Sequence, residues 1–463
     1  MTTVRRTVFL AGLLLLSCQI FADGIDDLAK KRIDDTGVPG LSITVVRNGK
    51  VIKSGAYGYS DIENKVRVKP ETVFEIGSIS KMFTSIGILQ LVAEKKMGLD
   101  DAVEKHWNEA PDAWKKLTIR QLLSHTSGIS EYLGINLDLR KDYRENDLLE
   151  IISKLPHDFE PGVTWSYSNG GYVLAAALLG KAGGDDWDDV IEDNIFKKLD
   201  MERSFMQSAA RVVPDRARGY TKLGKTYNNQ DFIRTGSAHG AGAVVSNGPD
   251  MAKWAIALDE ATICQKDILD QAFEPIKLKS GRTFDYGLGF FIREVAGKKV
   301  VEHGGNTFGF SAQITRIPEE KLTVIVLGNL AGQSYTGFSV EIAEQVLGKF
   351  PKPTLPDEKE DPDQSRRNRV IDAVNSLLSG EMNPSLVDEE ARAFFGTTRG
   401  AASRQAAGIS VGKVKAIRLL SDKKEGQDTE LRYKAYCTRG DFIMTILWSN
   451  EGKVVRLSLG PAG

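Results

Sequence analysis

Apolar positions alternate with polar ones in some regions of the chain and recur at helical spacing in others. Residues 41–47 and 50–55 are predicted to be paired strands, because they flank Asn48-Gly49, the dipeptide most typical of a tight β-hairpin. Further strands are predicted much later, at residues 287–295, 299–302, 311–317 and 321–329. Because these strands enclose a helical region, the pattern indicates an α+β fold whose antiparallel sheet is assembled from both ends of one large domain.

Helical periodicity dominates between the two groups of strands, for example at residues 148–155 and 172–179, and it also predicts a helix near residues 25–36. These helices flank the sheet and form a helical lobe. Another run, residues 79–92, is apolar around nearly its whole circumference, which predicts a buried helix. Its first turn nevertheless contains Lys81, so this lysine requires an explanation.

A change of pattern near residue 350 divides the chain. Residues 350–365 hold four of the 15 prolines in a charged, apolar-poor stretch, which predicts a linker. Residues 23–349 would then form the large domain. In residues 366–463 a helical pattern precedes alternating strands, which predicts a small C-terminal α+β domain with a helix laid on an antiparallel meander.

Residues 1–22 begin with basic residues, continue with an apolar stretch and end at the small residue Ala22. This is the pattern of a secretory signal peptide. The alternative is a lipobox in which Cys18 would carry a lipid anchor, although Leu16 fits that motif poorly. No later segment approaches the ~20 apolar residues that a membrane span needs. We therefore expect an exported protein, periplasmic or secreted, without a transmembrane segment.

The composition of the 463 residues, 41% hydrophobic and 27% charged, is that of an ordinary soluble globular protein. Removal of residues 1–22 takes away two arginines and changes the formal charge from −1 to −3, which gives no reason to expect binding to nucleic acid or to an anionic membrane. After cleavage only Cys264 and Cys437 remain; they lie in different predicted domains, so we expect two buried thiols. With five scattered histidines, we predict neither a metal site nor a cofactor.

Ser78 and Lys81 are three residues apart, so a helix would place them on the same face. A lysine near a helix N-terminus and among apolar neighbours loses its charge more readily, because the helix dipole and desolvation both disfavour the ammonium. A neutral amine beside a hydroxyl is a general base beside a nucleophile. The backbone N–H of Ser78 could then stabilise a developing oxyanion.

The same pair has a purely structural interpretation. Lys81 could extend its ammonium to solvent, and Ser78 could simply cap the helix. A lone Ser-x-x-Lys motif is common by chance, so the pair is a weak signal by itself.

Two further motifs strengthen the catalytic interpretation. Tyr167 and Asn169 occur in "WSYSNGGY", and His303, Gly304 and Gly305 occur in "VEHGGNTFGF", ahead of strand sequence. In this order, and together with "LTIRQLLSHTSGI" and "GAGAVVSNGPDMAKW", the chain resembles the penicillin-recognising serine hydrolases over about residues 24–348. That family includes class C β-lactamases, D-alanyl-D-alanine carboxypeptidases, D-aminopeptidases and related esterases. The resemblance implies a β-lactamase/transpeptidase-like fold and a serine hydrolase without a cofactor.

The resemblance also implies roles for the catalytic residues. Ser78 would attack an acyl carbonyl and become the acyl-enzyme, and Lys81 would take or relay its proton. Tyr167 would pass the proton to the leaving group, its acidity raised by the neighbouring lysine. Asn169 would hold a substrate amide or orient Lys81.

The third motif would bind the substrate. The strand beginning at His303 would pair with it main chain to main chain, and the backbone N–H of Asn306 would supply the second oxyanion donor beside that of Ser78. Gly304 and Gly305 fit this role, because side chains there would keep a ligand away from the strand.

His303 departs from the Lys-Thr-Gly motif of the β-lactamases of this group. A histidine with an ordinary pKa near 6.5 carries only a partial charge at pH 7, so it would bind a substrate carboxylate less strongly than lysine does. We therefore expect a peptide, amide or ester substrate, as for a D-amino-acid peptidase or an esterase, rather than efficient β-lactam hydrolysis. The alternative is a non-catalytic binder of peptides or cell-wall fragments.

Two other histidines could be mistaken for members of a catalytic triad. These are His125 in "LLSHTSG" and His239 in "SAHGAG". We interpret both as structural or pocket-lining residues.

Overall fold

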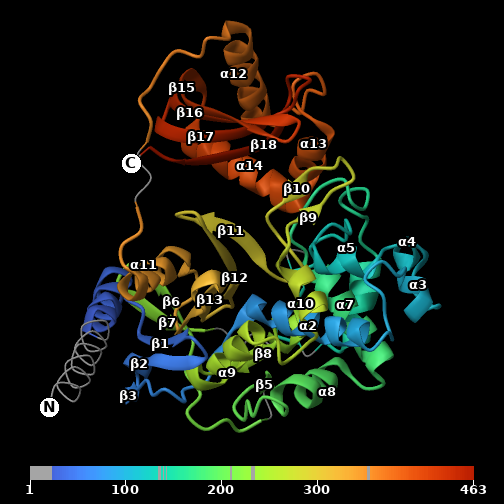
Figure 1. The fold of residues 1–463 in the computed structure, drawn as a ribbon, viewed down its shortest axis with the longest axis vertical. Helices are drawn as coiled ribbons and strands as arrows, with labels where there is room; N and C mark the ends of the chain where they lie inside the picture. Colours follow the sequence, from blue (N-terminus) through green and yellow to red (C-terminus); the bar gives the residue numbers. More distant parts are fainter. Residues whose placement is uncertain are drawn as a thin grey trace, which may run out of the picture.

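The computed structural model describes residues 23–462 apart from short gaps at 134–136, 139, 142, 209–210, 231–234 and 352–354. The predicted signal peptide and the alternative lipid anchor at Cys18 lie outside the described residues. The chain forms a large antiparallel sheet with a helical lobe beside it, and a second antiparallel sheet near the C-terminus (Figure 1). The predicted α+β fold with a main antiparallel sheet is therefore confirmed.

The main sheet has seven strands in the order β11-β12-β13-β14-β1-β2-β3. Their bounds are β1 Gly40–Arg47, β2 Lys50–Asp61, β3 Val66–Arg67, β11 Phe291–Val295, β12 Lys298–Asn306, β13 Ser311–Ile317 and β14 Leu322–Gly328. The predicted hairpin is confirmed: Arg47 pairs with Lys50, and both Asn48 and Gly49 adopt positive φ. The first hairpin pairs directly with β14, as Leu41 opposite Gly328 shows, so the two ends of the region meet within one sheet.

Both faces of this sheet are buried at its centre, whereas β2 and β3 are mostly half-buried or exposed. Along β14 every residue is buried, with Val324 and Val326 on one face and Ile325 and Leu327 on the other. The first face packs against the helix at residues 23–36 and against α11 (Thr336–Leu347). The opposite face belongs to the core shared with the helical lobe.

The helical lobe lies between the two groups of strands in sequence, as predicted. Its helices are α2 Ser80–Ala93, α3 Val103–His106, α4 Asp112–Lys115, α5 Ile119–Leu123, α6 Glu145–Ser153, α7 Asn169–Gly183, α8 Trp187–Ile191, α9 Gly248–Asp259 and α10 Lys266–Asp270. Short strands join these helices: β4 Phe74–Glu75, β5 Phe205–Met206 and β8 Val244–Ser246 form one sheet, β6 Tyr220–Leu223 pairs with β7 Thr226–Asn229, and β9 Ile276–Lys277 pairs with β10 Thr283–Phe284.

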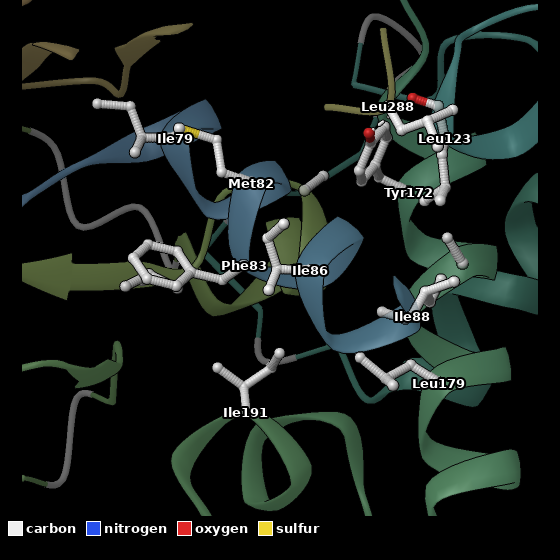
Figure 2. Packing of buried hydrophobic residues seen from close by; sticks show 14 of the residues in the cluster. Ile79, Met82, Phe83, Ile86, Ile88, Leu123, Tyr172, Leu179, Ile191 and Leu288 are labelled. Atoms are coloured by element: carbon white, nitrogen blue, oxygen red, sulfur yellow. Dashed lines mark hydrogen bonds between the residues drawn. The ribbon is translucent and has the colours of Figure 1, made fainter. Parts of the chain in front are cut away.

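Helix α2 is surrounded by apolar side chains, which confirms the burial predicted for residues 79–92. Figure 2 shows Phe83 on one side of the helix and Ile88 on the other, each among apolar side chains. Lys81 and Ser78 thus stand at the start of an element that has no solvent-facing side over most of its length.

The C-terminal unit, residues 364–461, contains three helices and a four-stranded meander. Its elements are α12 Gln364–Ser379, α13 Glu389–Gly396, α14 Thr398–Val411, β15 Val414–Glu425, β16 Asp428–Cys437, β17 Gly440–Trp448 and β18 Val454–Pro461. The strands pair in sequence order around an apolar core of their own. The sequence pattern predicted only one of the three helices and did not single out β15.

Part of the expected linker packs on the second sheet. Lys359 pairs with Leu419 of β15 through two backbone hydrogen bonds. Asp361 is buried and accepts hydrogen bonds from Arg366 and from the hydroxyl of Tyr433. Tertiary partners thus hold Lys359 and Asp361 on the second sheet, and the division of the chain by a linker stays a prediction.

Two predicted strands have different bounds in the structure. The strand expected at 287–295 begins only at Phe291, because the Gly287 amide donates back to the Phe290 carbonyl and forms a turn. The strand expected at 299–302 extends to Asn306, so His303 lies inside β12 rather than ahead of a strand. Among the described residues, no helix is both long and apolar enough to span a bilayer.

Candidate active site

Ser78 and Lys81 meet where a tight turn enters α2. Ser78 is the middle residue of the 3-10 turn Gly77–Ile79, and α2 continues this turn from Ser80. The Lys81 Nζ lies 3.3 Å from the Ser78 Oγ. The predicted contact between nucleophile and base is therefore present in the structure.

Burial controls the charge of Lys81. The side chain is 0% exposed, which excludes the alternative that it extends to solvent. Its Nζ donates to the Asn169 Oδ1 and to the Ala241 carbonyl, both at 2.7 Å. Desolvation lowers the Lys81 pKa from 10.5 to about 7, although the negative charge of Glu131 opposes the shift. The predicted fall in pKa is confirmed, and the amine is half neutral near neutral pH.

Tyr167 contacts Ser78, since its hydroxyl is hydrogen-bonded to that residue. Its ring lies under the Lys81 Nζ, 4.6 Å from the ring centre. The expectation that the lysine makes Tyr167 more acidic is wrong: burial is the largest influence and raises the Tyr167 pKa. Tyr167 therefore keeps its proton at neutral pH.

Asn169 links Lys81 to an acid that the sequence motifs did not reveal. Its Oδ1 accepts from Lys81, while its Nδ2 donates to the Glu131 Oε2 at 2.9 Å and its backbone N–H to the same oxygen at 3.1 Å. Glu131 thus fixes the orientation of the amide so that an oxygen faces the amine. The only sign of this role in the sequence is that Glu131 lies two residues after the "SHTSGI" segment.

His303 is neutral in this site. It is 1% exposed, and its Nδ1 lies 2.6 Å from the Gly304 carbonyl oxygen, which requires a proton on Nδ1 because both atoms cannot accept. The Nε2 then accepts from the Tyr286 hydroxyl at 3.3 Å. Burial, with a smaller effect of Lys81, lowers the His303 pKa to about 3. The partial positive charge expected for this histidine is therefore absent at neutral pH.

Close approach of two backbones places the two expected oxyanion donors together. A Cβ at Gly305 would overlap the Ile76 carbonyl oxygen and lie 3.2 Å from the Ser78 nitrogen. A Cβ at Gly77, whose φ is +52°, would lie 2.8 Å from the Asn306 nitrogen. Glycine is thus required on both sides of the contact, and the Ser78 and Asn306 nitrogens lie beside the same contact. Gly304 faces the Gln313 side chain instead.

His125 supports the segment that carries Tyr167. It is buried with positive φ, its Nδ1 accepts from the Ser168 N–H at 3.1 Å, and its ring centre lies 4.2 Å from that of Tyr167. His239 lies elsewhere in the lobe, where its Nε2 contacts a carboxylate oxygen of Glu145 at 2.6 Å. Neither histidine is hydrogen-bonded to Ser78.

The C-terminal unit also reaches this site. The guanidinium carbon of Arg399, in α14, lies 5.0 Å from the centre of the Tyr167 ring. Nearby, the two units enclose a cavity of about 460 Å³ whose lining includes Trp165, Phe284, Phe394 and Glu390. Nothing in the pattern of the C-terminal sequence pointed to Arg399.

Among the described residues around Ser78 there is no cluster suited to a metal. Within the described ranges, the one group of three acidic or metal-binding side chains close enough to share an ion comprises Asp186, Asp188 and Asp189, all exposed at the start of α8. The free thiols Cys264 and Cys437 are buried and half-buried, in the first and second units respectively.

Comparison with known proteins gives a consistent family assignment. The Beta-lactamase family profile matches residues 25–343. The chain is 29% identical over 359 residues to penicillin-binding protein 4* of Bacillus subtilis, covering 73% of this chain and 78% of that protein. It is 28% identical over 320 residues to the protein flp of Staphylococcus aureus, where the match spans 66% of this chain and 62% of the relative.

Solved structures share the fold. The octameric penicillin-binding protein homologue of Pyrococcus abyssi superposes with a TM-score of 0.61 at 23% identity, covering 94% of both chains. The D-amino acid amidase of Ochrobactrum anthropi has a TM-score of 0.61 at 21% identity, covering 71% of this chain and 98% of the amidase. The matched profile spans well over half of the sequence, and the chain therefore belongs to the beta-lactamase/transpeptidase-like family of the serine hydrolase superfamily.

Proposed function

We propose that the protein is an exported serine hydrolase that forms an acyl-enzyme at Ser78. The observation that carries the proposal is a buried lysine, with a pKa of about 7, whose Nζ lies 3.3 Å from a serine hydroxyl. Such an amine can accept the serine proton at neutral pH, which an ordinary lysine cannot do.

The proposed reaction uses the groups in turn. Lys81 takes the proton as the Ser78 Oγ bonds to the acyl carbon, and the backbone N–H groups of Ser78 and Asn306 stabilise the oxyanion. Tyr167, which stays protonated, donates to the leaving group and regains a proton from Lys81. Collapse of the tetrahedral species breaks the bond to the leaving group, and water then hydrolyses the ester at Ser78.

The favoured substrates are peptides, amides or esters, and D-amino-acid derivatives are the first to test. Neutral His303 lacks the charge that lysine provides in the third motif, which argues against efficient β-lactam hydrolysis. Two solved relatives of the fold bear the names D-amino acid amidase and D-stereospecific amidohydrolase.

The test compares wild type with Ser78→Ala on nitrocefin, p-nitrophenyl butyrate and a D-alanyl amide. Wild type should hydrolyse the ester or the amide faster than nitrocefin, and mass spectrometry should place a labelled phosphonate or penicillin on Ser78. Ser153→Ala, which removes a half-buried serine at the end of α6, is the matched control and should retain both activity and labelling. Full turnover by Ser78→Ala would contradict the proposal.

A non-catalytic binder is the second candidate, favoured by the neutral histidine in the third motif. A binder would retain peptide or cell-wall fragments without releasing product. Absence of both turnover and labelling in folded wild-type protein would support it.

The proposed export rests on the sequence of residues 1–22. Mass spectrometry of protein recovered from the producing cells should give Asp23 as the first residue. A lipid-modified N-terminus at Cys18 would indicate the lipoprotein alternative, and an intact Met1 would contradict export by either route.

A further inference from the structure

Helix α14 of the C-terminal unit begins beside the proposed active site. In Figure 1 this helix lies on the side of the C-terminal unit that faces β9, β10 and the helical lobe. The Thr397 side chain caps it by accepting from the Gly400 N–H at 2.9 Å. Arg399 stands in this capped first turn, so the backbone that aims its side chain toward Tyr167 is fixed.

The charge of Arg399 has no partner in the described part of the chain. Arg399 is exposed and forms neither a hydrogen bond nor an ion pair with any described residue. The other cation of the site, Lys81, has Glu131 as its counter-charge and two oxygen acceptors. His303 is neutral. Among the described residues, the proposed site therefore presents one unmatched positive charge, and it comes from the C-terminal unit.

A network of ion pairs holds that unit in place. Arg282, in the loop between β9 and β10, contacts Asp428 at 2.6 Å and Asp388 at 3.2 Å, and both acids belong to the C-terminal unit. Its side chain is only 12% exposed. The contact lies close to the active site, because Phe284 of β10 stacks on Trp165, two residues before Tyr167. The position of Arg399 beside Tyr167 is thus fixed by the ion pairs between Arg282 and the C-terminal unit.

We propose that Arg399 binds a carboxylate of the substrate, so that the C-terminal unit completes the active site and selects acyl substrates with a free carboxylate, such as peptides with an unblocked C-terminus. The planar guanidinium can pair with both oxygens of a carboxylate, and an exposed, unpaired arginine is available to do so. This inference rests on the proposed hydrolase function and names its substrate class.

The test uses a matched pair of substrates: an N-acyl-D-alanyl peptide ending in a free carboxylate and the same peptide ending in a carboxamide. Arg399→Ala should lower kcat/KM for the acid about tenfold or more, mainly through KM, while the amide and p-nitrophenyl butyrate change less than about twofold. Arg399→Lys should recover part of the loss. The control Arg404→Gln removes another arginine of α14, and its activity should match wild type.

Two results would overturn the inference. Equal losses on acid and amide would mean that Arg399 only supports the structure. Gains on both would mean that it obstructs the site.

A binding measurement separates this inference from the proposed chemistry. Calorimetry compares the free-acid peptide bound to Ser78→Ala and to Ser78→Ala/Arg399→Ala, and neither protein needs to turn it over. Weaker binding to the double variant by about tenfold supports carboxylate recognition even if the hydrolase proposal fails. Equal binding refutes the inference even if the wild type proves to be an active hydrolase.

Discussion

The Lys81 amine is surrounded by partners that accept hydrogen bonds without carrying a full charge. Asn169 and the Ala241 carbonyl each accept one bond, and the Ser78 hydroxyl lies at 3.3 Å. These contacts replace part of the lost hydration but do not restore the pKa of a solvated lysine. Glu131, which contacts Lys81 only through Asn169, opposes the fall in the Lys81 pKa.

The pH dependence of acylation should reflect this lysine. Because the Lys81 pKa is about 7, the base is protonated and inactive below that pH and neutral above it. We expect kcat/KM on a neutral ester to rise through about pH 7 and to level off above. A pH profile measured with p-nitrophenyl butyrate checks this, and a profile that is flat from pH 5 to 9 would contradict it.

Glu131→Gln should move that rise to lower pH. The carboxylate favours the ammonium form, so its removal lets the Lys81 pKa fall further. Some activity should be lost as well, since Asn169 loses a charged acceptor. The measurement is the pH profile of kcat/KM with p-nitrophenyl butyrate. Asp138→Asn, which changes an exposed acid, is the control variant. A rise that stays at the wild-type pH would show that Glu131 acts only on orientation.

At the scale of elements, the site depends on how β12 contacts the turn ahead of α2. Their backbones come so close that Gly305 and Gly77 leave no room for a side chain. This contact places the Ser78 and Asn306 nitrogens together, and it joins the main sheet to the helical lobe. The proposed oxyanion site thus depends on both elements rather than on either one alone.

Gly305→Ala should separate these elements. The new methyl group would overlap the Ile76 carbonyl, so β12 or the turn must move, and a shift of about 1 Å at a catalytic group can cost about 100-fold in rate. Gly304→Ala is the matched comparison, because its methyl group would meet only the end of the Gln313 side chain at 3.0 Å and should cost much less. Esterase assays and thermal unfolding of both variants test this. Equal activities would contradict it.

The sequence predicted the parts of this site that local spacing determines. Ser78 and Lys81 are one helical turn apart, and the hairpin at Asn48-Gly49 follows from its turn residues. The sequence could not predict Glu131, which is 38 residues from Asn169, or Arg399. Only tertiary packing brings these two residues to the proposed active site. The protonation states of His303 and Tyr167 also depended on burial, which an isolated motif does not reveal.

At the scale of the whole molecule, the C-terminal unit is attached to the rest through buried charges. We propose that it is a separate domain, since it has its own sheet and its own apolar core. Arg282 faces Asp388, Asp428 and Glu390 of the C-terminal unit. Within that unit, Arg456 also contacts Glu390 at 2.7 Å. One arginine of the first unit thus neutralises acids that would otherwise repel each other.

Arg282→Ala should loosen this attachment. Breaking a buried ion pair by removing one partner costs about 3–5 kcal/mol, because the opposite charges stay buried without compensation. We expect faster proteolytic separation of the two units and a loss of the preference for carboxylate substrates. Arg120→Ala is the control, since its pair with Asp100 is exposed and should contribute at most about 1 kcal/mol. Proteolysis at the wild-type rate would show that other contacts hold the units together.

The pairing of β1 with β14 has a consequence for how the chain folds. Leu41 and Gly328 are neighbours in the sheet but are separated by most of the polypeptide, so closing that loop is a slow, entropically costly step. Until residue 328 has left the ribosome, the edge of β1 that pairs with β14 stays unpaired and can associate with other chains. The main sheet of this protein therefore cannot be completed until most of the chain has been synthesised.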